Sequence, residues 1–254
     1  MKVSVPVSGG VISAHDTGGG GTPLVLVHAG WSDQSSWEGV AGRLAGQYRV
    51  ISYDARGYGE SPPPREPFTQ LGDLITVLDH LGLPQAALVG HSGGGGTAIG
   101  LALASPHRVS SLVLLAPGVQ DYPWPPDDPY NTEFMALASA GDRAGLAELC
   151  LRIWAMAGQD PVARAQVDGA VAAMFSLGDF ERPDPPAYDH LAEITAPAVL
   201  VLGDLEYPMV TRCSESIADR IPGCRRITAP GADHLLPLRV PDLIADVIRQ
   251  HVAR

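Results

Sequence analysis

The chain has 254 residues, of which 45% are apolar and 18% charged, which is enough apolar material for a large core and excludes a disordered chain. Its formal net charge is −11 and its Lys and Arg residues form no cluster, which argues against nucleic-acid and anionic-membrane partners. Three widely spaced cysteines, none in a CxxC pair, argue against a disulfide framework or a structural zinc site. No signal peptide and no long apolar run are visible, so we expect a cytoplasmic protein that acts on a small molecule.

The first half of the chain alternates short apolar runs with segments of helical periodicity. A turn at Gly9–Gly10 predicts an opening hairpin, and the later apolar runs are typical of strands buried on both faces. Helical spacing of apolar residues marks the segments between them. The predicted strands are 3–7, 11–16, 24–28, 48–53, 86–89 and 111–116, and the predicted helices are 35–47, 71–81 and 97–104.

The pattern changes after Gly118. Residues 121–129 contain four prolines and three aspartates, and the helical segments after them have no strand between them. There are 12 acidic and 4 basic side chains between Gly118 and His190. We interpret residues 119–190 as a helical cap, inserted into a core formed by residues 1–118 and 191–254.

The alternation of strands and helices resumes after the insertion. Strands are predicted at 198–202 and 225–228 and helices at 214–221 and 240–252. Strands that alternate with helices predict an α/β fold with a mostly parallel central sheet and helices on both faces. In such sheets a ligand binds beyond the carboxyl ends of the strands, so the loops that follow the strands should carry the functional residues.

The strongest local motif is Gly90-His91-Ser92-Gly93-Gly94, between a predicted strand and a predicted helix. A serine on such a turn is exposed to substrate, and the turn is crowded enough to need small neighbours at both ends. We therefore predict that Ser92 is a nucleophile. A phosphate-binding loop is disfavoured because the glycine run is not followed by the GK[ST] lysine.

A serine nucleophile needs a base and an acid that orients this base. Of the eight histidines, His234 alone lies on a late loop that follows a strand, so we predict that it is the base. The loop after residues 198–202 contains Asp204 and Glu206, and either carboxylate could be the acid.

The negative charge that develops on a substrate oxygen requires backbone N–H donors. Gly93, directly after the nucleophile, provides one. The second is expected in the loop His28-Ala29-Gly30-Trp31, where small residues allow close approach to a substrate. We therefore predict an oxyanion hole formed by Gly93 and a residue of this loop.

These motifs, in this order, resemble the α/β-hydrolase superfamily, and specifically its esterase, lactonase and haloperoxidase-like branch. The resemblance extends over nearly the whole chain and is specific for the fold, but much less so for the substrate. The matching stretches are 24–37 (LVLVHAGWSDQSSW), 53–61 (YDARGYGES), 88–94 (LVGHSGG), 199–208 (VLVLGDLEYP) and 230–236 (PGADHLL).

The resemblance implies an α/β-hydrolase fold, with Ser92 as nucleophile, His234 as base and Gly30 and Gly93 as oxyanion donors. Family spacing places the acid three residues after Gly203, which favours Glu206 over Asp204, with an acid near Asp121 as a third choice.

We expect Trp31 and His91, which flank these residues, to line the substrate pocket. Relatives often have His-Gly where this chain has His28-Ala29. The 54–59 motif, which includes Asp54 and Arg56, is interpreted as structural.

The expected reaction is hydrolysis of a carboxylic ester, lactone or thioester of a small, apolar molecule, without a metal or an organic cofactor. The same fold also carries perhydrolysis, C–C bond cleavage, lyase and oxygenase reactions, and a non-catalytic ligand-binding member is a further alternative. The sequence does not indicate the oligomeric state.

Overall fold

The computed structural model describes residues 1–252, which form an eight-stranded sheet of order β1-β2-β4-β3-β5-β6-β7-β8. The β1–β2 and β2–β4 pairs are antiparallel and all the others are parallel, as the strand–helix alternation predicts. The strands are β1 (Lys2–Val7), β2 (Gly10–Asp16), β3 (Thr22–Val27), β4 (Tyr48–Tyr53), β5 (Ala86–His91), β6 (Val109–Leu115), β7 (Ala198–Gly203) and β8 (Arg225–Ala229).

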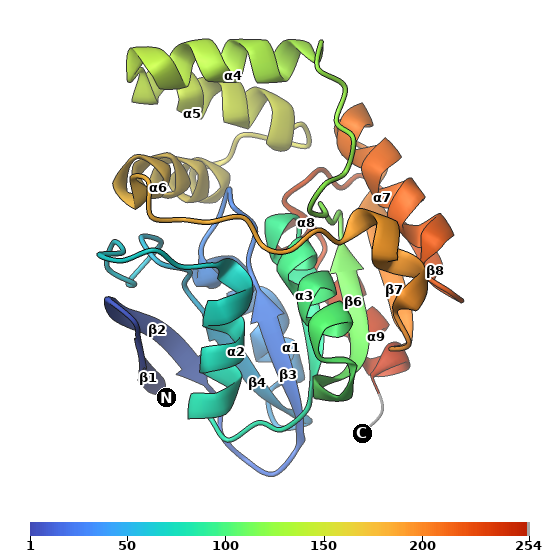
Figure 1. Cartoon of the computed structure of the whole chain (residues 1–254). Helices are drawn as coiled ribbons and strands as arrows, with labels where there is room; N and C mark the ends of the chain where they lie inside the picture. The colour runs from blue at the N-terminus through green and yellow to red at the C-terminus, as the bar shows by residue number, and fades with distance from the viewer. Residues whose placement is uncertain (253–254) are drawn as a thin grey trace.

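Helices cover both faces of the sheet, because successive side chains of a buried strand point to opposite sides. In β3, Leu24 and Leu26 join one apolar cluster and Val25 and Val27 the other. In Figure 1, α2 and α3 lie in front of the sheet, whereas α1 and α9 lie behind it. The helices of this core are α1 (Glu38–Leu44), α2 (Gln70–His80), α3 (Gly93–Ala104), α7 (Pro208–Arg220), α8 (Leu236–Arg239) and α9 (Pro241–His251).

Three further helices, α4 (Pro129–Ala140), α5 (Arg143–Trp154) and α6 (Pro161–Leu177), lie between β6 and β7 in the chain. We call them the inserted helices. Each begins after an aspartate whose carboxylate accepts from backbone N–H groups of the first turn, a strong helix-start signal. They are stacked above the sheet in Figure 1. None of the helices among residues 1–252 is both long and apolar enough to span a membrane.

Three helix boundaries differ from the sequence-based prediction. The helix expected at 35–47 is divided into a 3-10 turn, Gln34–Trp37, and α1. Helix α3 begins at Gly93 rather than at residue 97, and α7 begins at Pro208 rather than at residue 214. Glycine is a poor helix former by propensity, but the crowded start of α3 has no room for side chains, so packing overrides propensity there.

Candidate active site

Ser92 lies on a sharp turn between β5 and α3. Its backbone has φ 52° and ψ −118°, a conformation that a non-glycine residue adopts only when its surroundings enforce it. A Cβ atom on Gly90 would lie 2.5 Å from the carbonyl oxygen of Gly94, and one on Gly94 would lie 2.5 Å from that of His28. The glycines of the motif are therefore required by the backbone packing that raises Ser92, which is half-buried, out of the sheet.

His234 lies in the loop after β8 and is buried against a carboxylate. Its Nδ1 is 2.8 Å from Oε2 of Glu206, and both side chains are almost completely inaccessible to solvent. The other oxygen of Glu206 accepts from the backbone N–H of Tyr207 at 2.8 Å. Asp204, the alternative acid, instead accepts from the N–H of Gly231 at 2.7 Å, and Asp121 bonds to Gln120. Of the three acids considered from the sequence, Glu206 is the one that contacts this imidazole.

The His234 loop lies against the turn that carries Ser92. Nε2 of His91 donates to the carbonyl oxygen of His234 at 2.6 Å, and the two imidazole centroids are 5.1 Å apart. Across residues 1–252, Nε2 of His234 is buried and has no hydrogen-bond partner. Nδ1 of the adjacent His91 is likewise buried without a partner, so two imidazole nitrogens lack one beside the Ser92 turn.

The two backbone segments expected to bind an oxyanion lie side by side. A Cβ atom on Gly93 would lie 3.9 Å from the backbone nitrogen of Gly30, and both glycines are exposed. The Tyr58 hydroxyl donates to the Gly30 carbonyl at 3.1 Å, which holds this loop in place. His28 fixes the start of the same loop. The Nδ1 of His28 donates to the Ala29 carbonyl, and the Nε2 of His28 accepts from the N–H of Ala55.

An aromatic side chain from the inserted helices covers the histidine. The Trp154 indole, at the end of α5, lies 4.6 Å from the His234 imidazole between ring centroids. Trp31 stacks on Trp154 at 6.4 Å and meets Phe134 edge-on at 5.9 Å. The sequence does not reveal this contact, because no local pattern indicates which distant ring a tryptophan will contact.

The loop that carries His234 is also tied to the inserted helices. The buried Asp233 accepts from the N–H of Ala157 at 2.8 Å and from Nε of Arg239 at 3.1 Å. Arg239 also pairs with Asp160, the residue that caps α6. Charge-assisted hydrogen bonds of this kind are the stronger ones in proteins, so this network connects the His234 loop to both ends of the segment between α5 and α6.

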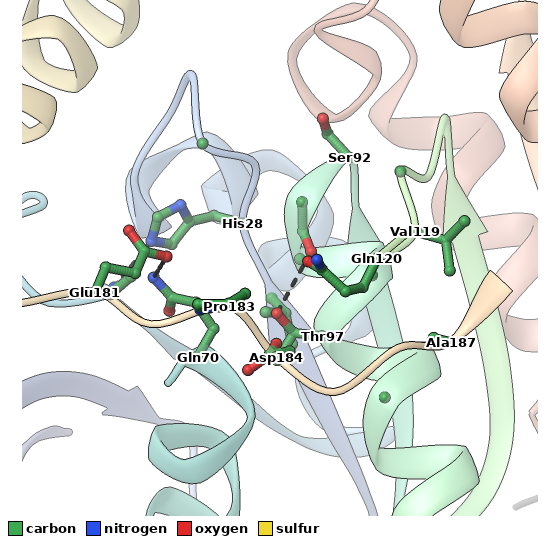
Figure 2. Close-up of a pocket in the computed structure, with 18 of the residues that line it drawn as sticks. His28, Gln70, Ser92, Thr97, Val119, Gln120, Glu181, Pro183, Asp184 and Ala187 are labelled. Atoms are coloured by element: carbon green, nitrogen blue, oxygen red, sulfur yellow. Dashed lines mark hydrogen bonds between the residues drawn. The ribbon is translucent and has the colours of Figure 1, made fainter. Parts of the chain in front are cut away.

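A cavity of about 680 Å³ opens beside Ser92. Its walls come from the carboxyl ends of β3 and β4, from α3, and from residues 181–187, which return from the inserted helices (Figure 2). Among residues 1–252, no group of three or more His, Cys, Asp or Glu side chains could hold a metal ion.

The expected pocket residues Trp31 and His91 are not among the residues that line this cavity, and neither are His234 and Glu206. His91 is only 1% exposed and meets Trp37 edge-on, with ring centroids 6.3 Å apart. The last side chain of β5 thus points to the α1 face of the sheet. Trp31 packs instead against the aromatic side chains of the inserted helices. Gly30 and Gly93 do line the cavity.

A model of the alpha/beta hydrolase family matches residues 24–247, so the chain belongs to this family. A crystal structure of a hydrolase from Pseudomonas aeruginosa PA01 superposes with a TM-score of 0.82 at 24% identity and covers 100% of this chain and 98% of that one. A thermophilic esterase from Thermogutta terrifontis gives a TM-score of 0.79 at 27% identity, over 99% of this chain and 100% of that one.

Among curated sequences, a 2-hydroxymuconate semialdehyde hydrolase from Pseudomonas sp. (strain CF600) is 37% identical over 116 residues, which are 43% of this chain and 41% of that protein. The chain spans between 30% and 41% of the length of the first curated relatives that it matches.

Proposed function

We propose that the protein is a serine hydrolase that cleaves a carboxylic ester, lactone or thioester of a small molecule through an acyl-enzyme. The observation that carries this proposal is the pairing of His234 with Glu206 at one ring nitrogen, while the other is buried without a partner beside the Ser92 turn. When Glu206 accepts a hydrogen bond from Nδ1–H of His234, the Nε2 atom of the neutral ring carries a lone pair and can accept a proton. Likeness to an esterase of known structure supports the same reaction class.

In the proposed mechanism the Ser92 hydroxyl attacks the substrate carbonyl and its proton passes to Nε2 of His234. Glu206 stabilises the imidazolium that forms, and the N–H groups of Gly30 and Gly93 stabilise the oxyanion. The imidazolium then protonates the leaving alcohol or thiol, and the acyl group remains on Ser92. A water molecule, deprotonated by His234, releases the acid and restores the serine.

The direct test is turnover of p-nitrophenyl butyrate by the wild type and by Ser92→Ala. We expect a loss of kcat/KM of about 10⁴-fold or more, because the nucleophile is removed while the fold keeps its packing. Labelling by a fluorophosphonate probe should disappear in the same variant. Unchanged turnover and labelling in Ser92→Ala would refute the assignment.

C–C bond cleavage is a second candidate, supported by the sequence likeness to the 2-hydroxymuconate semialdehyde hydrolase. The compound 2-hydroxymuconate semialdehyde carries a carboxylate. Two acidic side chains, Glu181 and Asp184, and one cation, Arg182, line the cavity here, so the charged lining has an excess of one negative charge, which disfavours an anion. Incubation with 2-hydroxymuconate semialdehyde, followed by absorbance, tests this alternative. Its consumption at a rate above that of p-nitrophenyl butyrate would favour C–C cleavage.

A further inference from the structure

His91, the last residue of β5, directly precedes Ser92 and is held in the interior by contacts with two other rings. It is 1% exposed, and its imidazole lies 6.3 Å from the Trp37 indole and 5.1 Å from the His234 imidazole between ring centroids. Protein interiors are close-packed, so a side chain enclosed in this way keeps one rotamer. The His91 ring is therefore a fixed point beside the candidate nucleophile.

The turn that follows His91 is itself held firmly by its backbone. The N–H of Ser92 donates to the Leu115 carbonyl at 2.9 Å, and the Ser92 carbonyl accepts from the N–H of Gly95 at 2.9 Å and from that of Gly118 at 3.0 Å. These bonds join the turn to β6, to the first turn of α3 and to the loop after β6. His91 and the backbone of Ser92 thus belong to one rigid unit.

The hydrogen bond from His91 to the His234 backbone fixes the tautomer of His91. A carbonyl oxygen can only accept, so Nε2 of His91, 2.6 Å from the His234 carbonyl oxygen, carries a hydrogen. Nδ1 of His91 is buried without a partner among residues 1–252, so no acceptor there holds a second proton. Burial, and then the charge of His234, hold the pKa of His91 well below its usual value. His91 is therefore a neutral ring whose single N–H is committed to His234.

His234 is in this way held at two points. His91 bonds to its main-chain carbonyl, and Glu206 bonds to its ring at Nδ1, at 2.8 Å. The first bond fixes where the residue stands relative to the Ser92 turn, and the second fixes the direction of the ring. His91 is not among the residues that line the cavity beside Ser92, so any effect of His91 on the reaction passes through His234.

We propose that His91 is a positioning residue, whose N–H ties the His234 loop to the nucleophile turn and so holds Nε2 of His234 where it can take the Ser92 proton. The tie joins residues 143 positions apart in the chain. A shift of about 1 Å in a reacting group can cost on the order of 10²-fold in rate, so the tie matters for turnover. This consequence rests on the proposed hydrolase function, and the tie itself does not.

The consequence for turnover is tested with His91→Leu and His91→Gln on p-nitrophenyl butyrate. Leucine cannot donate, whereas glutamine carries an amide N–H donor at the same ε position as the imidazole. We expect kcat to fall by about 10- to 100-fold in His91→Leu, with KM within about threefold of the wild type because His91 does not line the cavity. His91→Gln should recover most of the lost kcat.

A buried variant far from the site separates positioning from general destabilisation. Val77→Ala, in the core on α2, should lower the Tm and leave kcat unchanged. If His91→Leu does not fold, His91→Met takes its place, because methionine adapts to irregular core spaces. An unchanged kcat in the apolar variant, an equal loss in His91→Gln, or a loss confined to KM overturns the positioning role.

Amide hydrogen exchange tests the tie without any substrate. Residues 230–236, which carry His234, should exchange about 5- to 10-fold faster in His91→Leu than in the wild type, and at the wild-type rate in His91→Gln. Exchange in β7 should not change. Equal exchange of residues 230–236 in all three proteins overturns the tie. If the wild type turns over no ester, the hydrolase proposal fails, while hydrogen exchange still decides the tie.

Discussion

The Trp154 indole lies 4.6 Å from the His234 imidazole, centroid to centroid, with 41° between the ring planes. This contact joins two side chains 80 positions apart in the chain, one from the inserted helices and one from the loop after β8. The indole helps to shield the imidazole from solvent, and His234 is only 1% exposed. The inserted helices therefore complete the surroundings of the histidine as well as covering the sheet.

Replacement of Trp154 by Ala should lower both stability and turnover. Trp154 is 6% exposed, and truncation of a buried tryptophan removes about 3–5 kcal/mol of stability, which lowers the Tm of a chain of this size by on the order of 10 °C. Trp154→Phe keeps an aromatic ring and should lose less. Differential scanning calorimetry measures the change, with Trp124→Ala, 41% exposed, as the control. Equal losses in Trp154→Ala and Trp124→Ala would contradict the packing role.

Glu206→Gln should lower kcat on p-nitrophenyl butyrate by about 10²- to 10⁴-fold, because a neutral amide neither fixes the imidazole tautomer nor stabilises the imidazolium. Asp204→Asn is the matched control. Its carboxylate accepts from Gly231 instead of His234, so we expect its kcat to stay within about threefold of the wild type. A large loss in Asp204→Asn together with a small one in Glu206→Gln would reverse the assignment of the acid.

Gly94→Ala should destabilise the protein, because the added methyl group would meet the carbonyl oxygens of Val27 and His28. Forced overpacking of this kind destabilises by about 1–3 kcal/mol or more. Gly169→Ala, on the exposed face of α6 with nothing within 4 Å of the added atom, should instead stabilise by about 0.5–1 kcal/mol. Urea denaturation measures both changes. Similar shifts in the two variants would show that the turn is less crowded than the structure indicates.

Stability should fall as the pH drops below about 6.5, partly through His91. Burial, and then the charge of His234, hold the pKa of His91 well below its usual value. Between that lowered pKa and about 6.5 the unfolded chain binds the additional proton, so stability rises with pH by up to about 1.4 kcal/mol per unit for this group.

Urea titrations between pH 5 and pH 7.5 measure this slope. His91→Gln, whose amide can still donate to the His234 carbonyl, should reduce it, whereas the exposed-site variant His107→Gln should leave it unchanged. A steeper slope in His91→Gln would contradict the prediction. His28 is also buried with a lowered pKa, so part of the slope should remain.

The sequence by itself determined the fold class and the positions of the candidate catalytic residues along the chain. Strand and helix periodicity, the glycines around Ser92 and the order of Ser92, Glu206 and His234 are local signals. They arise because backbone sterics and side-chain alternation act over a few residues. The mostly parallel sheet and the α/β-hydrolase family therefore followed from the pattern, and the family spacing favoured Glu206 as the acid.

Only the tertiary structure decided which distant side chains meet. It showed that Glu206 rather than Asp204 contacts His234, that His91 packs against Trp37, and that Trp154 covers the imidazole. Such contacts depend on how whole elements pack, because side-chain direction at a loop is set by partners that no local pattern specifies.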